Sequence, residues 1–218
     1  MIPPEITTSQ ALAVAAGLVP PAAGGRRLLG LTGPPGAGKS SFGRKLTAAL
    51  APHAVLVPMD GFHLATAELE RLGRAERKGA PDTFDPAGFV ALLRRLRAAD
   101  EPVVYAPEFR RELEEPVAGA IPVAREVALV VVEGNYLLLG GDWEQARLLL
   151  DACWYLDLDD AERIRRLVRR HTSYGRSPAA ARAWVRRTDE ANAALIRARR
   201  HRADLVVRMP AGRGRSRS

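Results

Sequence analysis

One run of the chain has residue types and a spacing that suit the binding of phosphate groups. Residues 33–40 fit the pattern GxxxxGK[ST] and lie between a short apolar run and a segment with helical periodicity. Glycines here let backbone N–H groups turn towards phosphate oxygens, and the amino end of the next helix adds a positive dipole end. The residues expected to bind the nucleotide are Gly33, Pro34, Pro35, Gly36, Ala37, Gly38, Lys39, Ser40 and Ser41.

The side chains that end this motif indicate how a nucleoside triphosphate would be held. Lys39 is expected to reach the β- and γ-phosphates as a catalytic residue, and the Ser40 hydroxyl to ligate Mg²⁺. The motif alone leaves three uses of the nucleotide open. They are phosphoryl transfer to a small molecule, GTP-dependent switching, and ATP hydrolysis that drives motion.

Two carboxylates follow apolar runs at places where a parallel sheet would open into a ligand crevice. Asp60 comes after residues 55–57, and Glu133 after residues 127–132. Asp60 could accept the proton of an attacking hydroxyl, and Glu133 occupies the Walker-B position, where an acid holds Mg²⁺. For each residue taken alone, an aspartate in a turn or a solvent-facing glutamate is the plain alternative.

The elements that must position these residues alternate along the chain. Helical periodicity covers residues 39–50, 85–98 and 160–170, and residues 103–105 are short and extended. Short apolar runs separated by helices predict parallel strands with helices on both faces, so the fold class is α/β. The apolar runs are residues 28–31, 55–57, 127–132, 153–156 and 205–207.

Length and composition predict one globular domain. The chain has 218 residues, 47% hydrophobic and 27% charged, and we expect a single domain over 1–210 with a disordered basic tail over 211–218. No apolar run reaches the about 18 residues that span a bilayer, and the amino end lacks a basic start to a signal peptide. The single cysteine, Cys153, forms no internal disulfide. These features predict a cytoplasmic protein without a membrane partner.

Five motifs in order resemble the phosphoribulokinase/uridine kinase/bacterial pantothenate kinase superfamily of P-loop kinases. They are Gly33–Ser41, Met59–Phe62, Lys78–Asp85, Val104–Pro107 and Val132–Gly134. The resemblance is nearest to the nucleoside/nucleotide kinase branch that includes fructose transport kinases. It implies a P-loop NTPase fold, whose core sheet has five parallel strands in the order 2-3-1-4-5, with helices on both faces and a helical lid.

The resemblance also implies roles for individual residues. Asp60 matches the catalytic base, and Glu133 matches an acid near Mg²⁺. Arg110 stands where the family places a polar residue, so Arg111 is the better match to a substrate contact. The residues expected at the acceptor substrate are Phe62, Tyr105, Phe109 and Arg111.

An arginine-rich stretch near the carboxyl end has two interpretations. The formal net charge is +8, and residues 161–202 hold 13 arginines against three acidic residues. The superfamily carries a lid here, expected over about 161–187, and by position its catalytic arginines match Arg169 and Arg176, with Arg170 as a substitute. A nucleic-acid interface would need interleaved aromatic residues, and this stretch offers only Tyr174 and Trp184.

The sequence therefore predicts an ATP- and Mg²⁺-dependent kinase that transfers the γ-phosphate to a hydroxyl of a nucleoside, pantothenate or sugar-like acceptor. The alternative is a nucleotide-binding ATPase- or GTPase-type switch or chaperone without such an acceptor. The chain has no Asn-Lys pair, which excludes guanine recognition through an Asn-Lys-x-Asp motif. A homodimer is the default expectation for its assembly.

Overall fold

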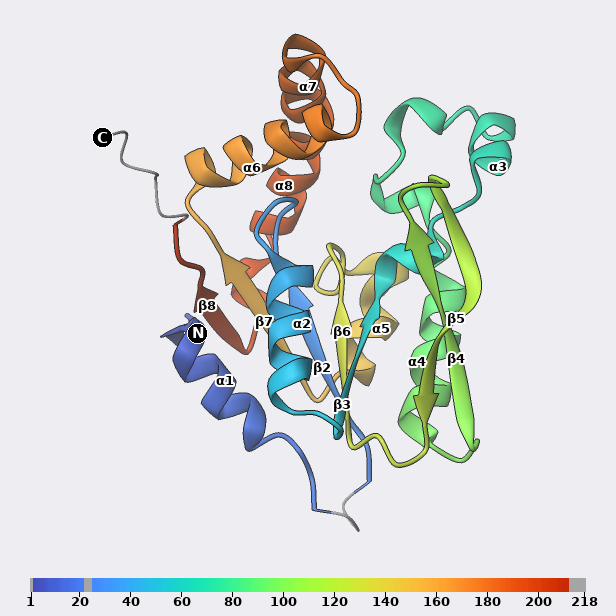
Figure 1. Cartoon of the computed structure of the whole chain (residues 1–218), viewed down its shortest axis with the longest axis vertical. Helices are drawn as coiled ribbons and strands as arrows, with labels where there is room; N and C mark the ends of the chain where they lie inside the picture. The colour runs from blue at the N-terminus through green and yellow to red at the C-terminus, as the bar shows by residue number, and fades with distance from the viewer. Residues whose placement is uncertain (1, 22–24, 212–218) are drawn as a thin grey trace.

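Six parallel strands form the central sheet in the computed structural model, which describes residues 2–21 and 25–211 (Figure 1). Their order across the sheet is β1-β8-β7-β2-β6-β3, and each neighbouring pair is parallel. The strands are β1 (Glu5–Thr7), β2 (Arg27–Thr32), β3 (Ala54–Pro58), β6 (Leu129–Glu133), β7 (Ala152–Asp157) and β8 (Leu205–Arg208).

The sheet has one strand more than the five that the sequence predicts. The five predicted runs are neighbours in the order β3-β6-β2-β7-β8, and β1 pairs with β8 at the edge. β1 has only three residues and no apolar run, so its sequence carries no strand signal. Glu5 helps to hold it there, because its carboxylate accepts hydrogen bonds from Arg200 at 2.6 Å and Arg208 at 2.7 Å.

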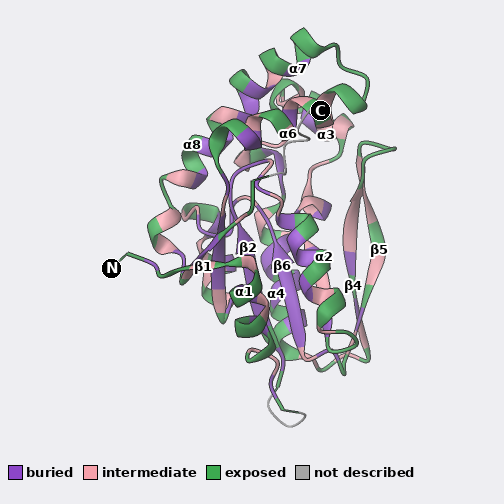
Figure 2. Cartoon of the chain, turned by 60° about the vertical axis from the view of Figure 1, so that its left-hand side comes forward, coloured by how far each residue is buried: buried purple, intermediate pink, exposed green. Residues whose placement is uncertain are grey.

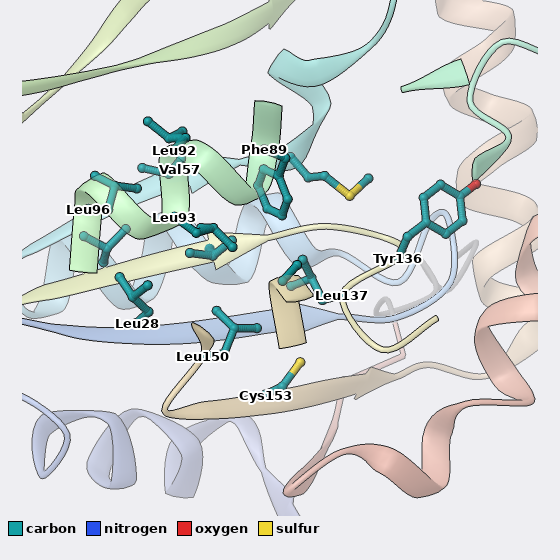
Figure 3. Packing of buried hydrophobic residues seen from close by; sticks show 14 of the residues in the cluster. Leu28, Val57, Phe89, Leu92, Leu93, Leu96, Tyr136, Leu137, Leu150 and Cys153 are labelled. Atoms are coloured by element: carbon teal, nitrogen blue, oxygen red, sulfur yellow. The ribbon is translucent and has the colours of Figure 1, made fainter. Parts of the chain in front are cut away.

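Helices cover both faces of this sheet (Figures 1 and 2). Successive residues of β2 point to opposite faces, so Leu28 and Leu29 belong to different core clusters. Leu28 lies in the cluster with Phe89 of α4 (Figure 3), whereas Leu29 lies in the cluster with Phe42 of α2. The covering helices are α1 (Thr8–Ala16) and α2 (Lys39–Ala49) on one face, and α4 (Pro86–Ala98) and α5 (Glu144–Leu149) on the other.

An antiparallel hairpin stands beside the sheet. It consists of β4 (Val103–Arg110) and β5 (Glu115–Ala124), where the sequence predicts only a short extended segment over 103–105. β4 packs against the turn that follows β3. A Cβ on Gly61 would lie 2.4 Å from the carbonyl oxygen of Pro107, so only glycine permits this approach. The hairpin is thereby held next to Asp60.

Three α-helices, a π-helix and the 3₁₀ helix Arg200–Arg202 lie between β7 and β8. α6 starts at a cap in which the Asp159 carboxylate accepts from the Glu162 N–H at 3.0 Å, and acidic residues in its first turn suit the helix dipole. Figure 1 shows these helices at the same end of the sheet as the hairpin tip and α3 (Thr66–Arg71). The elements are α6 (Asp160–Ser173), α7 (Pro178–Trp184), the π-helix Val185–Asp189 and α8 (Glu190–Arg197).

Two further sequence predictions concern the ends and the membrane. Residues 212–218 of the predicted basic tail lie outside the described residues, and Ala211 is exposed. Within the described ranges, every helix is too short or too polar to cross a bilayer.

Candidate functional site

The phosphate loop joins the end of β2 to the start of α2, as the sequence predicts. Gly36 has φ +82° and Gly38 has φ +92°, which are left-handed conformations that favour glycine. A Cβ on Gly36 would lie 2.8 Å from Cγ of Leu167, so α6 packs directly against the loop. Gly38 caps α2, and its carbonyl accepts from the Phe42 N–H at 2.9 Å.

A fully buried arginine ties this loop to the carboxyl-terminal helices. Arg163 of α6 has no solvent exposure and donates from Nη1 to the carbonyl oxygen of Pro35 at 3.2 Å. Its other nitrogens donate to Asp160 at 2.9 Å and to Glu190 of α8. A buried cation needs such partners, and here they connect three segments around the loop.

Lys39 is buried at the centre of the loop. Its Nζ donates to the carbonyl oxygens of Gly33 at 2.8 Å and Pro34 at 3.3 Å. Burial lowers the pKa of Lys39 to about 8, although the charges of Glu133 and Asp60 act in the opposite direction. The ammonium is therefore close to both carboxylates predicted at the strand ends.

Glu133 ends β6 next to this lysine and is also buried. One of its carboxylate oxygens, Oε2, has no hydrogen-bond partner among the described residues. Burial raises the pKa of Glu133, while Lys39 and a hydrogen bond with Ser40 lower it. An unpartnered carboxylate oxygen beside a hydroxyl is a donor set that Mg²⁺ accepts together with phosphate and water oxygens.

These residues fit a magnesium ion that is held partly by its nucleotide. No group of three or more His, Cys, Asp or Glu side chains that could hold a metal occurs in the described part of the chain. Mg²⁺ in phosphoryl-transfer sites binds through one or two protein ligands and keeps its other positions for phosphates and waters. Ser40 and Glu133 are sufficient for that kind of site.

Asp60 lies in the short 3₁₀ turn Met59–Phe62, directly after β3. Nδ1 of His63 lies 2.7 Å from the Asp60 carbonyl oxygen, and since a carbonyl only accepts, this ring nitrogen donates. Burial lowers the pKa of His63, which keeps the ring neutral. The turn is thus fixed while the Asp60 carboxylate faces the cleft described next.

A single cleft of about 1190 Å³ brings most of the predicted residues together. It extends from the phosphate loop, past the strand ends, to the hairpin tip and the end of α6. Its lining includes these residues that the sequence predicts: Pro35, Gly36, Gly38, Lys39, Ser40, Ser41, Asp60, Phe109, Arg111, Glu133 and Arg176.

Six predicted residues are not part of the cleft lining: Gly33, Pro34 and Ala37 of the phosphate loop, and Phe62, Tyr105 and Arg169. Phe62 packs into the core, with its ring centre 5.3 Å from that of Phe89. Tyr105 is 57% exposed on the outer side of β4, because side chains alternate along a strand and its two neighbours point inward. Arg169 is exposed, and Arg170, one helical position further on, lines the cleft instead.

Several cleft residues escaped the sequence analysis. His171 and Asp189 form a pair, 2.8 Å from Nε2 to Oδ2, in which Asp189 ends the π-helix. Asn192, for which the sequence offers no role, is buried and donates to the carbonyl oxygen of Gly79 at 3.2 Å. The 3.6-residue period of apolar residues does not identify a π-helix, so the position of Asp189 in the cleft could not be predicted from the sequence.

Comparison with known proteins places residues 28–213 in the family model described as "Phosphoribulokinase / Uridine kinase family". A Schizosaccharomyces pombe protein named "Putative uridine kinase" is 34% identical over 160 residues, which cover 69% of this chain and 68% of that protein. The "ATP-dependent kinase-like protein" of Aspergillus versicolor is 36% identical over 145 residues, 62% of this chain and 84% of that protein.

One solved structure is similar to this chain along its whole length. It is the crystal structure of a "putative fructose transport system kinase" from Silicibacter sp. TM1040, with 37% sequence identity and a TM-score of 0.84. The match covers 94% of this chain and all of that one. The sheet, the phosphate loop and the helices around the cleft therefore belong to a shared architecture.

Proposed function

The chain belongs to the phosphoribulokinase/uridine kinase family, and we propose that it transfers the γ-phosphate of Mg-ATP to a hydroxyl group of a small molecule. It is a P-loop nucleotide-binding kinase by family and fold. The observation that carries the proposal is that Lys39, Asp60 and Glu133 line one cleft, with the two carboxylates close enough to affect the pKa of the lysine. A nucleoside or sugar-like acceptor is supported by the names of the relatives.

In the proposed mechanism each of these residues has one task. Asp60 accepts the proton of the acceptor hydroxyl, whose oxygen then attacks the γ-phosphorus in line with the leaving β-phosphate oxygen. Lys39 donates to phosphate oxygens in place of the loop carbonyls that it contacts here. Mg²⁺ bound at Ser40 and Glu133 would neutralise charge on the phosphates.

The helices after β7 are proposed to act as the lid, over about residues 161–187. Arg170 lines the cleft and is partly buried, and Arg176 lies with its guanidinium carbon 4.0 Å from the ring centre of Trp184. Stacking on an aromatic face limits the freedom of an arginine side chain while leaving its N–H donors free. In this proposal both arginines neutralise the charge that spreads over the transferring phosphoryl group.

The proposal is tested by release of ADP from Mg-ATP with a panel of acceptors. The panel contains uridine, cytidine, pantothenate, fructose, ribose and ribulose 5-phosphate, and Lys39→Ala serves as the blank. We expect one acceptor to stimulate ADP release at least tenfold. ATP hydrolysis that no acceptor stimulates would instead favour the nucleotide-dependent switch.

The role of Asp60 is tested in the same assay. Asp60→Asn should lower kcat about 100-fold or more and leave ATP binding within about twofold, because a general base contributes roughly 10²–10⁴ in rate. The matched control is Asp100→Asn, which removes the charge of an exposed carboxylate outside the cleft and should leave kcat unchanged. Unchanged turnover of Asp60→Asn would remove this base from the mechanism.

A further inference from the structure

Two guanidinium groups line the cleft from elements that are far apart in the sequence. Arg111 lies at the tip of the β4–β5 hairpin, and Arg170 lies near the end of α6. The hairpin tip and α6 come together at Tyr174, since the guanidinium carbon of Arg111 lies 6.0 Å from the centre of the Tyr174 ring. Within the described ranges, neither arginine forms an ion pair or a side-chain hydrogen bond with a carboxylate.

The arginines next to these two in the sequence or on the helix do have carboxylate partners, so the lack of such a partner is particular to Arg111 and Arg170. Arg110, next to Arg111, lies 2.8 Å from Glu108 and 3.6 Å from Glu112. Arg166, one turn before Arg170, lies 2.8 Å from Glu162. Arg110 and Arg166 line the same cleft, so the two elements provide carboxylates for these arginines but none for Arg111 and Arg170.

The two unpaired cations also affect each other. Burial lowers the pKa of Arg170, and Arg111 is the charged group that lowers it further, against the opposing charges of Asp189 and Asp60. Asp189 is engaged by His171 at 2.8 Å, and Asp60 is needed for the acceptor hydroxyl. Two like charges held in one partly buried cleft are stabilised by an anion that binds between them.

The position of Arg111 associates this anion with the acceptor rather than with ATP. A smaller hollow of about 340 Å³ is lined by Arg111, Phe109 and Asp60, and its other charged residues are Arg44, Glu108 and Glu133. Arg170 lines only the larger cleft. Lys78 lies on the same side, with Nζ 5.3 Å from the centre of the Phe109 ring and donating to the Thr66 hydroxyl at 2.9 Å. One small molecule can therefore place its hydroxyl at Asp60 and an anionic group at Arg111.

We propose that the acceptor carries an anionic group, a carboxylate or a phosphate, and that this group binds between Arg111 and Arg170. The inference rests on the proposed kinase function, since it assigns the acceptor end of the same cleft. It also separates this chain's acceptor from neutral nucleosides and sugars. A neutral acceptor would leave Arg111 without a counter-charge.

The binding of inorganic phosphate tests the site without any turnover. Titration calorimetry would be done with protein saturated by Mg²⁺ and a non-hydrolysable ATP analogue, so that a γ-phosphate already occupies its own position. We expect phosphate or acetate to bind, Arg111→Gln to weaken this binding at least tenfold, and Arg111→Lys to restore part of it. The matched control is Arg110→Gln, whose arginine is already paired and whose loss should leave the affinity unchanged.

Absence of anion binding in the presence of the analogue would overturn the inference, because the arginines would then serve the nucleotide phosphates alone. Binding that Arg111→Gln and Arg110→Gln leave equally strong would overturn it as well. Comparison of phosphate with acetate distinguishes the two kinds of anionic group. Since no phosphoryl transfer is measured, these outcomes do not depend on whether the proposed function holds.

Matched acceptors then test the inference in the kinase reaction. Glycerol, glycerate and glycerol 3-phosphate share a skeleton, as do fructose and fructose 6-phosphate, and differ in charge. We expect the anionic members to have at least tenfold higher kcat/KM, and Arg111→Gln to raise their KM tenfold while the KM of ATP changes less than twofold. Lys39-dependent transfer that prefers the neutral members would contradict the inference and leave the kinase function intact.

Discussion

Tyr136 and Asn192 donate hydrogen bonds to the same oxygen, the carbonyl of Gly79. Tyr136 is fully buried and follows the end of β6, and Figure 3 shows its ring at the end of the core cluster with the hydroxyl directed out of it. Asn192, also buried, lies on α8. The Gly79 carbonyl therefore connects the loop that follows Glu133, the segment that carries Lys78, and the helices of the proposed lid.

Removing one of these donors should loosen the acceptor end of the cleft. Tyr136→Phe is expected to lower the free energy of unfolding by about 1 kcal/mol, since a typical buried hydrogen bond contributes this much. The KM of the acceptor should rise several-fold, while the KM of ATP stays within twofold. Steady-state kinetics and denaturant titration check this, and Asn192→Ala should give a non-additive double variant. An increase in the KM of ATP alone would contradict it.

Nucleotide affinity should depend on pH through Lys39. Burial lowers the pKa of Lys39 to about 8, so the unliganded protein loses this positive charge as the pH rises above 8. Phosphate binding requires the ammonium, and we expect ATP affinity to fall by up to tenfold per pH unit above that value. Calorimetry at pH 8 should detect proton uptake on binding. Lys39→Met should bind weakly, with no such dependence between pH 7 and 9.5.

The lowered pKa of Lys39 also makes the free energy of unfolding depend on pH. The folded-state pKa of about 8 lies below the unfolded value of 10.5, so between these values the unfolded chain holds the proton that the folded chain has lost. The cost of the buried charge is fully present below pH 8 and is relieved as the pH rises to 10.5. Lys39→Met should therefore raise Tm at pH 7, with a difference that shrinks towards pH 10. A constant difference in Tm would contradict this.

Glu133→Gln tests the magnesium ligand with two readouts. The substitution keeps the shape of a buried side chain and removes the carboxylate charge, whose burial raises its pKa. We expect the Mg²⁺ concentration for half-maximal nucleotide binding to rise at least tenfold. Tm without Mg²⁺ should stay equal or increase, because a buried carboxylate with one unpartnered oxygen loses its charge. A decrease in Tm with normal Mg²⁺ dependence would assign Glu133 a structural role instead.

Substitutions at two glycines distinguish the cost of a steric contact from the cost of backbone strain. Gly36→Ala forces a left-handed conformation and places Cβ 2.8 Å from Cγ of Leu167 and 3.0 Å from the Arg163 carbonyl oxygen. Gly73 also has a positive φ, +64°, but a Cβ there meets nothing within 4 Å. Gly73→Ala should cost about 1 kcal/mol, and Gly36→Ala should cost more and weaken ATP binding. Equal losses in thermal unfolding would contradict the contact between the loop and α6.

Adjacent arginines on α6 should differ sharply in the kinase assay. Arg170 lines the cleft, whereas Arg169 is exposed on another face of the same helix. Arg170→Gln is expected to lower kcat about 100-fold, as loss of a cation at the transferring phosphoryl group does. Arg169→Gln should remain within twofold of the unchanged protein. A larger loss of kcat in Arg169→Gln than in Arg170→Gln would instead assign the catalytic role to Arg169, the residue that the sequence motif favours.

Some parts of this protein are determined by short stretches of sequence. Gly33 to Ser40 combine glycine conformations with a lysine and a hydroxyl in one contiguous loop, so their phosphate-binding role could be predicted from a single stretch of sequence. Asp60 and Glu133 could be placed because the carboxyl ends of neighbouring parallel strands always meet at one edge of a sheet. The family motifs led to the same residues.

Other parts were decided by contacts between distant segments. β1 forms a strand because it pairs with β8 and because two arginines donate hydrogen bonds to Glu5. The hairpin lies next to Asp60 because Gly61 permits close packing. Which of Arg169 and Arg170 enters the cleft depends on the rotation of α6 against the phosphate loop, and a rotation of one residue moves a side chain by about 100°. The convergence of Tyr136 and Asn192 on Gly79 requires three separate segments to meet. Such pairings arise only in the folded chain, since no local pattern encodes them.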